Sequence, residues 1–270
     1  MSSATALIAG TGALPRLLAQ AAPGMLICEL DGFACEIPGA EPLRFRIERL
    51  AVFLDALVDR GIQRVCFAGA MRRPRLEAEL FDMRTASLVP RLLPAIQAGD
   101  DATLRAVIEL FEEWGLTVVG ADEIAPDLVP GAGILTGTPS DADLRDAARG
   151  AEIVAALGAA DVGQGAVVAQ GLCLATEALP GTDAMLEFAA LHQGLKPDPK
   201  GARGVFYKAP KPGQDRRIDL PALGPETVAR AAAAGLAGIA FEAGGVLLLD
   251  RAATIAAAEE AGLFLWAREP

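Results

Sequence analysis

Hydrophobic residues in the first half of the chain alternate between short apolar runs and stretches with helical spacing. The runs at residues 5–9, 25–30 and 64–68 are typical of buried strands, and residues 14–20 have the spacing of a helix. Strand and helix patterns in alternation indicate β-α-β units, which build a parallel sheet covered by helices. The sequence therefore predicts an α/β fold.

The clearest helix pattern covers residues 99–115, with the sequence GDDATLRAVIELFEEWG. Asp100 and Asp101 suit the start of a helix, because their carboxylates can accept hydrogen bonds from its first amides. The apolar residues that fall on one face are Leu104, Val107, Ile108 and Phe111. Gly115 suits the end of the helix. The sequence thus predicts an amphipathic helix, followed by a buried strand at residues 116–121.

The regular alternation lapses at residues 126–140, which are rich in glycine and proline. Such stretches are typical of connections between domains. The chain has 270 residues, which is enough for two hydrophobic cores. We therefore expect an N-terminal domain at residues 1–132 and a C-terminal domain at residues 133–270.

The second half predicts a core rich in strands with helices beside it. Two stretches resemble hairpins, residues 163–178 with a turn at Gln170 and Gly171, and residues 238–250. Residues 263–267 resemble a final strand. The expected helices are residues 140–158, 225–235 and 251–262.

The charge of the chain argues against some functions. Its formal net charge is −11 and its basic residues are scattered, whereas nucleic-acid binding needs clustered cations. No stretch without charged side chains is longer than residues 162–176, and these are too short to cross a bilayer. The N-terminus has no basic start or cleavage site of a signal peptide. We therefore expect a cytoplasmic protein that binds no nucleic acid.

The cysteines and the single histidine constrain metal and redox chemistry. The four cysteines form no CxxC pair and lie mostly in apolar runs, so buried thiols are expected at Cys28, Cys35, Cys66 and Cys173. Zinc and binuclear hydrolases draw several ligands from histidine, and this chain has only His192. A catalytic metal here should be a hard ion held by oxygen, with Mg²⁺ favoured. We expect His192 to be exposed or structural.

Residues 8–15, IAGTGALP, place two glycines between a predicted strand and a predicted helix. Gly10 and Gly12 let the chain turn tightly and bring amide groups close to a phosphate. The dinucleotide fingerprint needs a third glycine near Pro15, which is missing, so an ordinary turn is an equal alternative. Downstream, Glu29 and Asp31 could meet a ribose hydroxyl or could be surface carboxylates.

A second group of charged and polar residues gathers in the second half of the chain. Pyrophosphate hydrolysis needs cations or N–H donors for the phosphate oxygens, and carboxylates to hold Mg²⁺ or to orient water. A solvated, charged loop would have the same composition. The candidates are Asp161, Gln164, Glu177, Thr182, Asp183, Lys208, Lys211, Gln214, Asp215, Arg216, Arg217 and Asp219.

Two places in this group are more specific. Residues 208–221, KAPKPGQDRRIDLP, contain three prolines, which stiffen the loop before a substrate arrives. Asp219 interrupts an apolar stretch, so its carboxylate should meet a cation or cap a helix or turn. Thr182 and Asp183 could cap the helix that follows them, or could receive phosphate at its start.

Several segments in this order closely resemble the UDP-2,3-diacylglucosamine pyrophosphatases of the LpxI type, over essentially the whole chain. The segments are residues 8–15, 66–74 (CFAGAMRRP), 99–115, 161–168 (DVGQGAVV), 181–186 (GTDAML), 208–221, 234–239 (AGLAGI) and 247–251 (LLLDR). At Thr11 the sequence departs from the glycine expected in many relatives. Because threonine carries a Cβ, close approach of a phosphate there is less certain.

The resemblance implies a Mg²⁺-dependent enzyme of lipid A biosynthesis, which converts UDP-2,3-diacylglucosamine to 2,3-diacylglucosamine 1-phosphate (lipid X) and UMP. Water would attack the phosphorus on the sugar side. It also implies a Rossmann-like N-terminal domain, a distinct C-terminal α/β domain with substrate between them, and a possible homodimer. The essential aspartate of the family maps to Asp219. Because both lipids are amphiphilic, transient contact with the inner membrane is expected.

The predicted site combines these arguments. Catalytic roles are expected for Asp219, Asp183 and Lys208, and the two aspartates are the expected metal ligands. The expected substrate-binding residues are Gly10, Thr11, Gly12, Ala13, Gln164, Gly165, Thr182, Lys211 and Gln214. Two other functions stay open, a nicotinamide-dependent oxidoreductase and a non-catalytic protein that binds a nucleotide sugar. The missing third glycine and the lack of an obvious hydride-transfer acid argue against the oxidoreductase.

Overall fold

A computed structural model describes residues 4–71, 76–98 and 100–270 of the chain. Its contacts divide the protein into two compact units. Unit 1 consists of Met1–Pro126 with Asp215–Asp219, and unit 2 consists of Asp127–Gln214 with Leu220–Pro270. The expected capping by Asp100 and Asp101, and the end of the segment at residues 66–74, fall outside the described side chains and residues.

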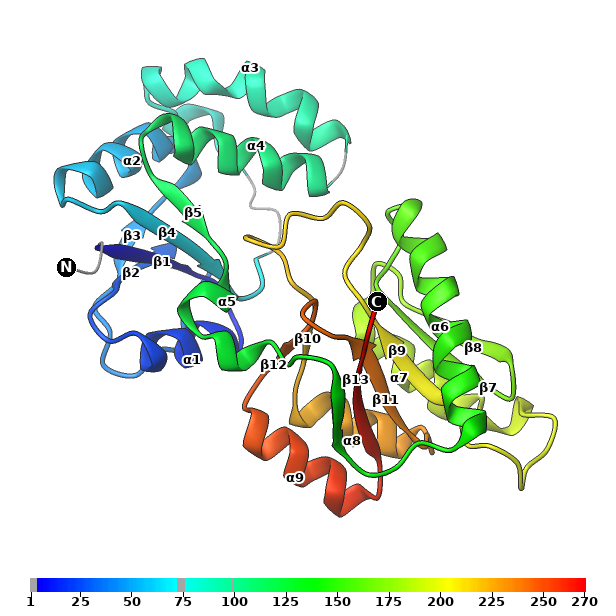
Figure 1. The fold of residues 1–270 in the computed structure, drawn as a ribbon. Helices are drawn as coiled ribbons and strands as arrows, with labels where there is room; N and C mark the ends of the chain where they lie inside the picture. Colours follow the sequence, from blue (N-terminus) through cyan, green and yellow to red (C-terminus); the bar gives the residue numbers. More distant parts are fainter. Residues whose placement is uncertain (1–3, 72–75, 99) are drawn as a thin grey trace. The chain divides into compact units, whose positions relative to one another are not determined.

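Unit 1 is built on a parallel sheet of five strands in the order β3-β2-β1-β4-β5 (Figure 1). The strands are β1 (Thr5–Ala9), β2 (Leu26–Leu30), β3 (Leu43–Phe45), β4 (Arg64–Ala68) and β5 (Thr117–Val119). The strand order runs outward from β1 in both directions. In such sheets a crevice opens beyond the carboxyl ends of the two central strands, here β1 and β4. The predicted Rossmann-like architecture is confirmed.

Helices cover both faces of this sheet, with α1 and α5 on one side and α2, α3 and α4 on the other (Figure 1). They are α1 (Ala13–Ala21), α2 (Leu50–Asp59), α3 (Met83–Ala98), α4 (Asp100–Glu113) and α5 (Ala121–Ile124), with short 3₁₀ turns at Ile47–Arg49, Ala78–Leu80 and Pro126–Leu128. The amphipathic helix predicted at residues 99–115 is α4. Its Ile108 and Phe111 are buried against the sheet, and Gly115 follows with a φ of +77°.

Unit 2 contains a mixed sheet of six strands in the order β6-β13-β11-β9-β7-β8, and a separate pair of short strands, β10 and β12. The strands are β6 (Gly133–Thr136), β7 (Gly165–Ala169), β8 (Leu172–Thr176), β9 (Val205–Lys208), β10 (Ala222–Leu223), β11 (Gly238–Glu242), β12 (Leu247–Leu248) and β13 (Phe264–Arg268). The three central strands are parallel, and the outer strands are antiparallel to their neighbours. Unit 2 is therefore a second, distinct α/β unit, as expected.

The helices of unit 2 bury two apolar clusters on opposite faces of the large sheet. They are α6 (Asp141–Ala159), α7 (Gly181–Leu191), α8 (Pro225–Ala233) and α9 (Arg251–Ala261), with a 3₁₀ turn at Gln193–Leu195. On one face α6 packs with Ala147 and Val154 against β7 and β9. On the other face α7, α8 and α9 pack together. The helix predicted at residues 140–158 starts with a capping box, in which Ser140 and Asp143 bond each other's amides.

One of the two predicted hairpins is confirmed and the other is wrong. Strands β7 and β8 form an antiparallel hairpin, in which Gln170 and Gly171 adopt positive φ and donate their amides to the buried Asp146. Residues 238–250 do not form a hairpin. Strand β11 is an interior strand with a parallel neighbour on each edge, so the segment after it has no free edge to pair with. It pairs with β10 instead, as β12.

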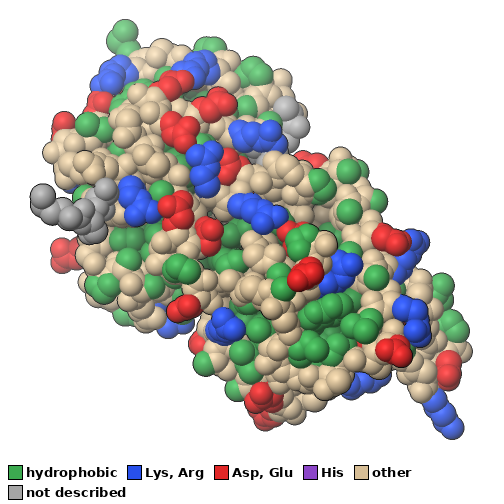
Figure 2. Space-filling view, in the orientation of Figure 1, with side chains coloured by type: hydrophobic (Ala, Val, Ile, Leu, Met, Phe, Trp, Pro, Cys, Tyr) green, Lys and Arg blue, Asp and Glu red, His purple; other side chains and the backbone are tan. Residues whose placement is uncertain are grey.

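Charged side chains of both signs are present on the surface. On the face that Figure 2 shows, basic and acidic side chains are interspersed and form no extended area of one sign. Within the described parts of the chain, no helix combines the length and the apolar character needed to cross a bilayer.

Candidate functional site

The predicted glycine turn lies at the carboxyl end of β1, where it is bonded to the loop after β4. The Gly10 N–H donates to the carbonyl of Ala68 at 2.8 Å. Thr11 and Ala70 exchange amide-to-carbonyl hydrogen bonds of 3.0 and 2.9 Å. A Cβ on Gly10 would lie 2.6 Å from the Ala70 carbonyl oxygen, too close for any side chain. Gly10 is therefore required by the packing of the two loops.

The contribution of each residue in the turn to phosphate binding differs. The Thr11 amide is used by Ala70, and the Thr11 hydroxyl donates to the same carbonyl at 3.1 Å. Gly12 adopts a φ of +98° before α1, and open space surrounds the position of a Cβ. Amides in the first turn of a helix have no acceptor within the helix, so those of Gly12 and Ala13 can point at an anion. Phosphate binding by the amides of Gly12 and Ala13 stays a prediction. The Thr11 amide is no longer part of it, because it donates to Ala70.

A glycine after β4 completes this arrangement, and it was missed among the predicted site residues. Gly69 has a φ of +90°, and a Cβ there would lie 2.6 Å from the Thr11 carbonyl oxygen and 2.8 Å from Pro15 Cγ. The sequence did contain a signal for Gly69, since a glycine that directly follows a predicted strand indicates a tight turn there. Residues 66–74 had been noted only for their resemblance.

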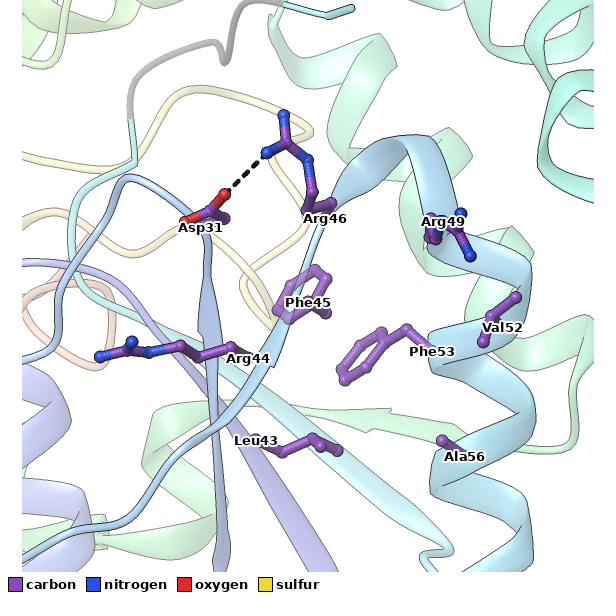
Figure 3. A pocket seen from close by; sticks show the side chains of 9 residues that line it. All are labelled: Asp31, Leu43, Arg44, Phe45, Arg46, Arg49, Val52, Phe53 and Ala56. Atoms are coloured by element: carbon purple, nitrogen blue, oxygen red, sulfur yellow. Dashed lines mark hydrogen bonds and ion pairs between the residues drawn. The ribbon is translucent and has the colours of Figure 1, made fainter. Parts of the chain in front are cut away.

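The carboxylates after β2 have structural partners. Glu29 is buried, and it accepts hydrogen bonds from the Cys35 amide at 2.9 Å and from Arg44 Nε at 3.0 Å. The Cys35 amide bond outweighs burial and, with Arg44, holds the pKa of Glu29 below its usual value. Asp31 is exposed and pairs with Arg46 at 2.9 Å (Figure 3). The surface-carboxylate interpretation is therefore right for Asp31 and wrong for Glu29.

A pocket of about 480 Å³ opens beside Asp31 at the edge strand β3 (Figure 3). Phe45 and Phe53 stack inside it, with ring centroids 3.9 Å apart. Its lining residues are Asp31, Leu43, Arg44, Phe45, Arg46, Arg49, Val52, Phe53 and Ala56. Strand β2 lies between β3 and β1 in the sheet, and none of the lining residues belongs to the glycine turn.

The segment Asp215–Asp219 packs with unit 1, although the chain around it belongs to unit 2. Arg217 pairs with Glu112 of α4 at 2.8 Å and with Asp215 at 2.7 Å. Ile218 packs against the hydrophobic core of unit 1. The hydrogen bonds from Arg217 are the main cause of a lowered pKa at Asp215. An apolar anchor and ion pairs thus hold the loop that carries Asp219.

This segment reaches the edge of the sheet where the glycine turn lies. A Cβ on Gly120, directly after β5, would lie 3.6 Å from the Arg216 carbonyl oxygen. Because β1, β4 and β5 are parallel neighbours, their carboxyl ends share one edge of the sheet. Asp219 is half-buried, and its amide donates to the Asp215 carbonyl at 3.3 Å. Unit 1 therefore brings the predicted catalytic aspartate and the glycine turn to the same edge.

In unit 2, three polar side chains form a partly buried chain of contacts. Lys208 ends β9 and is only 6% exposed, and its Nζ donates to Thr182 Oγ1 at 2.5 Å. The Thr182 hydroxyl donates to Glu177 Oε2 at 2.9 Å, and that oxygen lies 3.6 Å from Lys208 Nζ. A Cβ on Gly165 would lie 2.7 Å from the same oxygen, so the glycine leaves room for the carboxylate. The predicted residues Lys208, Thr182 and Gly165 thus meet around Glu177.

Glu177 was noted among the charged candidates but was given no role in the predicted site. Its amide donates to the Gly165 carbonyl at 2.8 Å, directly after β8. The neighbouring Gln164 contributes its carbonyl oxygen, which accepts from the Ala209 amide at 3.1 Å. The backbone therefore fixes the carboxylate beside Lys208.

Lys211 and Gln214 form a separate arrangement in the loop after β9. Lys211 Nζ pairs with Asp161 at 2.5 Å, and its amide donates to Gln214 Oε1 at 2.9 Å. A Cβ on Gly158, near the end of α6, would lie 2.7 Å from Pro212 Cδ. The stiff loop is thus packed against α6 and closed by its own side chains.

Asp183 directly follows Thr182 in the first turn of α7. Its carboxylate is exposed and pairs with Arg230 Nε at 3.3 Å. Helix α7 begins at Gly181 without a side-chain cap, so neither Asp183 nor Thr182 caps it. The capping alternative is wrong, because both residues lie inside the first turn and the Thr182 hydroxyl donates to Glu177.

Comparison with known proteins identifies the family. Residues 4–128 match the profile of the LpxI N-terminal domain, and residues 131–266 match that of the LpxI C-terminal domain. The chain is 40% identical to the UDP-2,3-diacylglucosamine pyrophosphatase LpxI of Caulobacter vibrioides over 274 aligned positions, which cover 98% of this chain and 97% of that protein. The chain belongs to the LpxI family. The resemblance inferred from the sequence is confirmed.

The metal ligands predicted for this LpxI protein fit Mg²⁺ unequally. Mg²⁺ is usually held by one or two carboxylates together with water and substrate phosphates. Asp183 shares its carboxylate with a guanidinium group and belongs to unit 2, whereas Asp219 belongs to unit 1. Among the described residues, no group of three His, Cys, Asp or Glu side chains could hold a metal by itself. Asp219 and Asp183 stay predicted ligands, and the substrate would have to supply further oxygens.

The remaining predictions for this LpxI protein concern its thiols and its histidine. Cys28 and Cys66 are buried, and burial raises the pKa of each to about 12. Cys35 is half-buried and Cys173 is exposed, so the expectation of a buried thiol is wrong for Cys173. His192 stacks on Phe188, and its Nδ1 lies 2.8 Å from the Phe188 carbonyl oxygen. This is the structural role that was expected.

Proposed function

We infer that this chain hydrolyses UDP-2,3-diacylglucosamine to 2,3-diacylglucosamine 1-phosphate and UMP. The observation that carries this inference is identity of 40% along almost the full length of a relative whose name states that activity. Both domains of the LpxI family are matched, at residues 4–128 and 131–266.

The carboxyl edge of the unit 1 sheet is where we propose that the diphosphate binds. The amides of Gly12 and Ala13 can donate to phosphate oxygens, and the segment of Asp219 reaches the same edge. Asp219 would orient the attacking water. The oxygen of this water bonds to the phosphorus on the sugar side, the bond from that phosphorus to the bridging oxygen breaks, and UMP leaves with the bridging oxygen.

Mg²⁺ is part of the proposal, with Asp219 as the residue that holds it. When bound, the ion would offset negative charge on the diphosphate oxygens. We also propose that Lys208, oriented by Thr182 and Glu177, contributes a fixed positive charge for a phosphate group. Lys211 and Gln214 would line the substrate site from their own loop.

The test is release of UMP from UDP-2,3-diacylglucosamine with Mg²⁺, followed with the Asp219→Asn variant. Asparagine keeps the size of the side chain and removes its charge, so the variant should fold and lose about 10²-fold or more of the turnover. Asp59→Asn, an exposed position on α2, is the matched control and should keep wild-type turnover. An Asp219→Asn protein that releases UMP at the wild-type rate would remove this residue from the mechanism.

Two further measurements separate the alternatives. In ¹⁸O-labelled water the label should appear in the sugar phosphate, whereas label in UMP would refute attack on the sugar side. Removal of Mg²⁺ by a chelator should stop UMP release, and added Mg²⁺ should restore it. Binding of the nucleotide sugar without release of UMP would instead favour the binding protein. A substrate-dependent change in nicotinamide absorbance would favour the oxidoreductase.

A further inference from the structure

Helix α7 of unit 2 buries one face and exposes large apolar side chains on the other, beside Asp183 and Glu187, which pair with Arg230. Its inner face, with Met185 and Leu186, is buried against the sheet and the neighbouring helix. On the outer face, Phe188 is half-exposed and Leu191 is 82% exposed, and in the 3₁₀ turn that follows Leu195 is 69% exposed. Phe188 and Leu191 are three positions apart and lie on one side of the helix, and the turn that carries Leu195 follows directly. Large apolar side chains that cluster in the open usually mark a surface that something covers.

The exposed apolar surface continues onto the edge strand β8. A pocket of about 400 Å³ lies between β8 and α7, and Phe188 lines it together with Cys173. Leu172 at the start of β8 is about half-exposed and lies directly after the β7–β8 turn. Phe188, Leu191, Leu195 and Leu172 are called the apolar patch below.

A loop with an excess of cations follows the apolar patch along an otherwise acidic chain. The loop of residues 196–203 follows Leu195 directly, and its charged residues are Lys196, Asp198, Lys200 and Arg203. Three cations and one carboxylate give this loop a charge of about +2, whereas the whole chain has −11. Gln170, in the turn before Leu172, holds the loop in place through hydrogen bonds with Asp198 and Ala202.

We propose that the apolar patch and the loop at residues 196–203 together dock on a lipid bilayer that carries anionic head groups. Exposed leucine and phenylalanine side chains beside lysine and arginine are the combination that binds the interface of an anionic bilayer. This inference rests on the proposed function, because a substrate with two acyl chains resides in such a bilayer. A second copy of the chain is a poorer occupant, since a symmetric contact would bring the two basic loops near each other.

The experiment is flotation of the full chain with vesicles of phosphatidylcholine alone or with phosphatidylglycerol added. The wild-type protein should float with the anionic vesicles, and binding should weaken as salt is raised. Leu191→Glu, and independently Leu195→Glu, should weaken binding by about tenfold or more, because each removes an inserted side chain and adds repulsion. Lys200→Glu should weaken it by about tenfold.

Matched controls separate this surface from general effects of charge. Leu93→Glu changes an exposed leucine of α3 in unit 1, and Arg251→Glu changes an exposed cation at the start of α9. Both should float like the wild type. All variants should release UMP from substrate dissolved in detergent at the wild-type rate. Lost flotation with intact release concerns the docking surface alone, whereas absent release in the wild type refutes the proposed function.

Three results would overturn the proposal. The first is a wild-type protein that does not float with anionic vesicles. The second is equal flotation of Leu191→Glu, Leu195→Glu and the Leu93→Glu control. The third is a wild-type dimer in sedimentation that Leu191→Glu converts to a monomer, because a second copy would then cover the apolar patch.

Discussion

Loss of Lys208 should destabilise unit 2 far more than loss of Lys211, although each lysine pairs with a carboxylate. The side chains of Lys208 and Glu177 are 7% and 14% exposed, whereas those of Lys211 and Asp161 are 20% and 46% exposed. Lys208→Met removes the ammonium group that lies 3.6 Å from the poorly solvated Glu177 carboxylate, which still accepts a hydrogen bond from the Thr182 hydroxyl. A buried charge without its partner costs about 3 kcal/mol, whereas an exposed pair contributes below about 1 kcal/mol.

A double-mutant cycle measures how strongly the two side chains depend on each other. Its second single variant, Glu177→Gln, removes the carboxylate and leaves the lysine charge. Each single variant should therefore be destabilised, and the double variant Lys208→Met with Glu177→Gln should recover part of the loss. The expected coupling free energy is about 2 kcal/mol. The matched cycle at Lys211 and Asp161 should give a coupling below about 1 kcal/mol.

Urea unfolding measures these free energies, with one tryptophan as the reporter of unit 2. The chain has two tryptophans, Trp114 in unit 1 and Trp266 on β13 of unit 2. In a Trp114→Phe background, the fluorescence of Trp266 follows unit 2. Additive effects of Lys208→Met and Glu177→Gln, with no coupling between them, would show that the two side chains do not depend on each other and would refute this reasoning.

Two further predictions concern unit 1. Gly10→Ala should destabilise unit 1 by about 2–3 kcal/mol, because its Cβ would lie 2.6 Å from the Ala70 carbonyl oxygen. Chemical denaturation measures this, and a loss below about 0.5 kcal/mol would show that the two loops can part without cost. Asp215 has a pKa that Arg217 lowers in the folded state, so its contribution to stability is present above the unfolded pKa, about 3.9, and is lost as the pH falls further. The unfolding free energies of the wild type and of Asp215→Asn should converge from about pH 4 downward, and a constant difference would contradict the assignment.

Strands β1, β2, β4 and β5 of unit 1 could be predicted because parallel strands are buried on both faces. Residues 5–9 and 64–68 therefore appear as continuous apolar runs, and they became β1 and β4. The same apolar character led to the wrong prediction of a hairpin at residues 238–250. A strand with two occupied edges and the first strand of a hairpin have the same local pattern, and only the pairing of distant strands distinguishes them.

The candidate site was predictable in its residue types more than in its arrangement. The stiff loop at residues 208–221 was recognisable from its prolines, but nothing in its own pattern indicates that Asp215–Asp219 packs with the other unit. Glu177 was missed as a partner of Lys208 because 31 positions separate them along the chain. The strand order β9-β7-β8 brings them together, and strand order is a long-range property.

The return of Asp215–Asp219 to unit 1 also affects how the molecule can be made. A fragment that ends at Pro126 lacks Ile218 and the partner of Glu112, so it exposes apolar surface that the full chain covers. During synthesis, unit 1 cannot complete its core until the ribosome has passed Asp219, because Ile218 is made only then. Chaperones that shield apolar surface would act in that interval, and aggregation in the cell should be most sensitive to substitutions of Ile218.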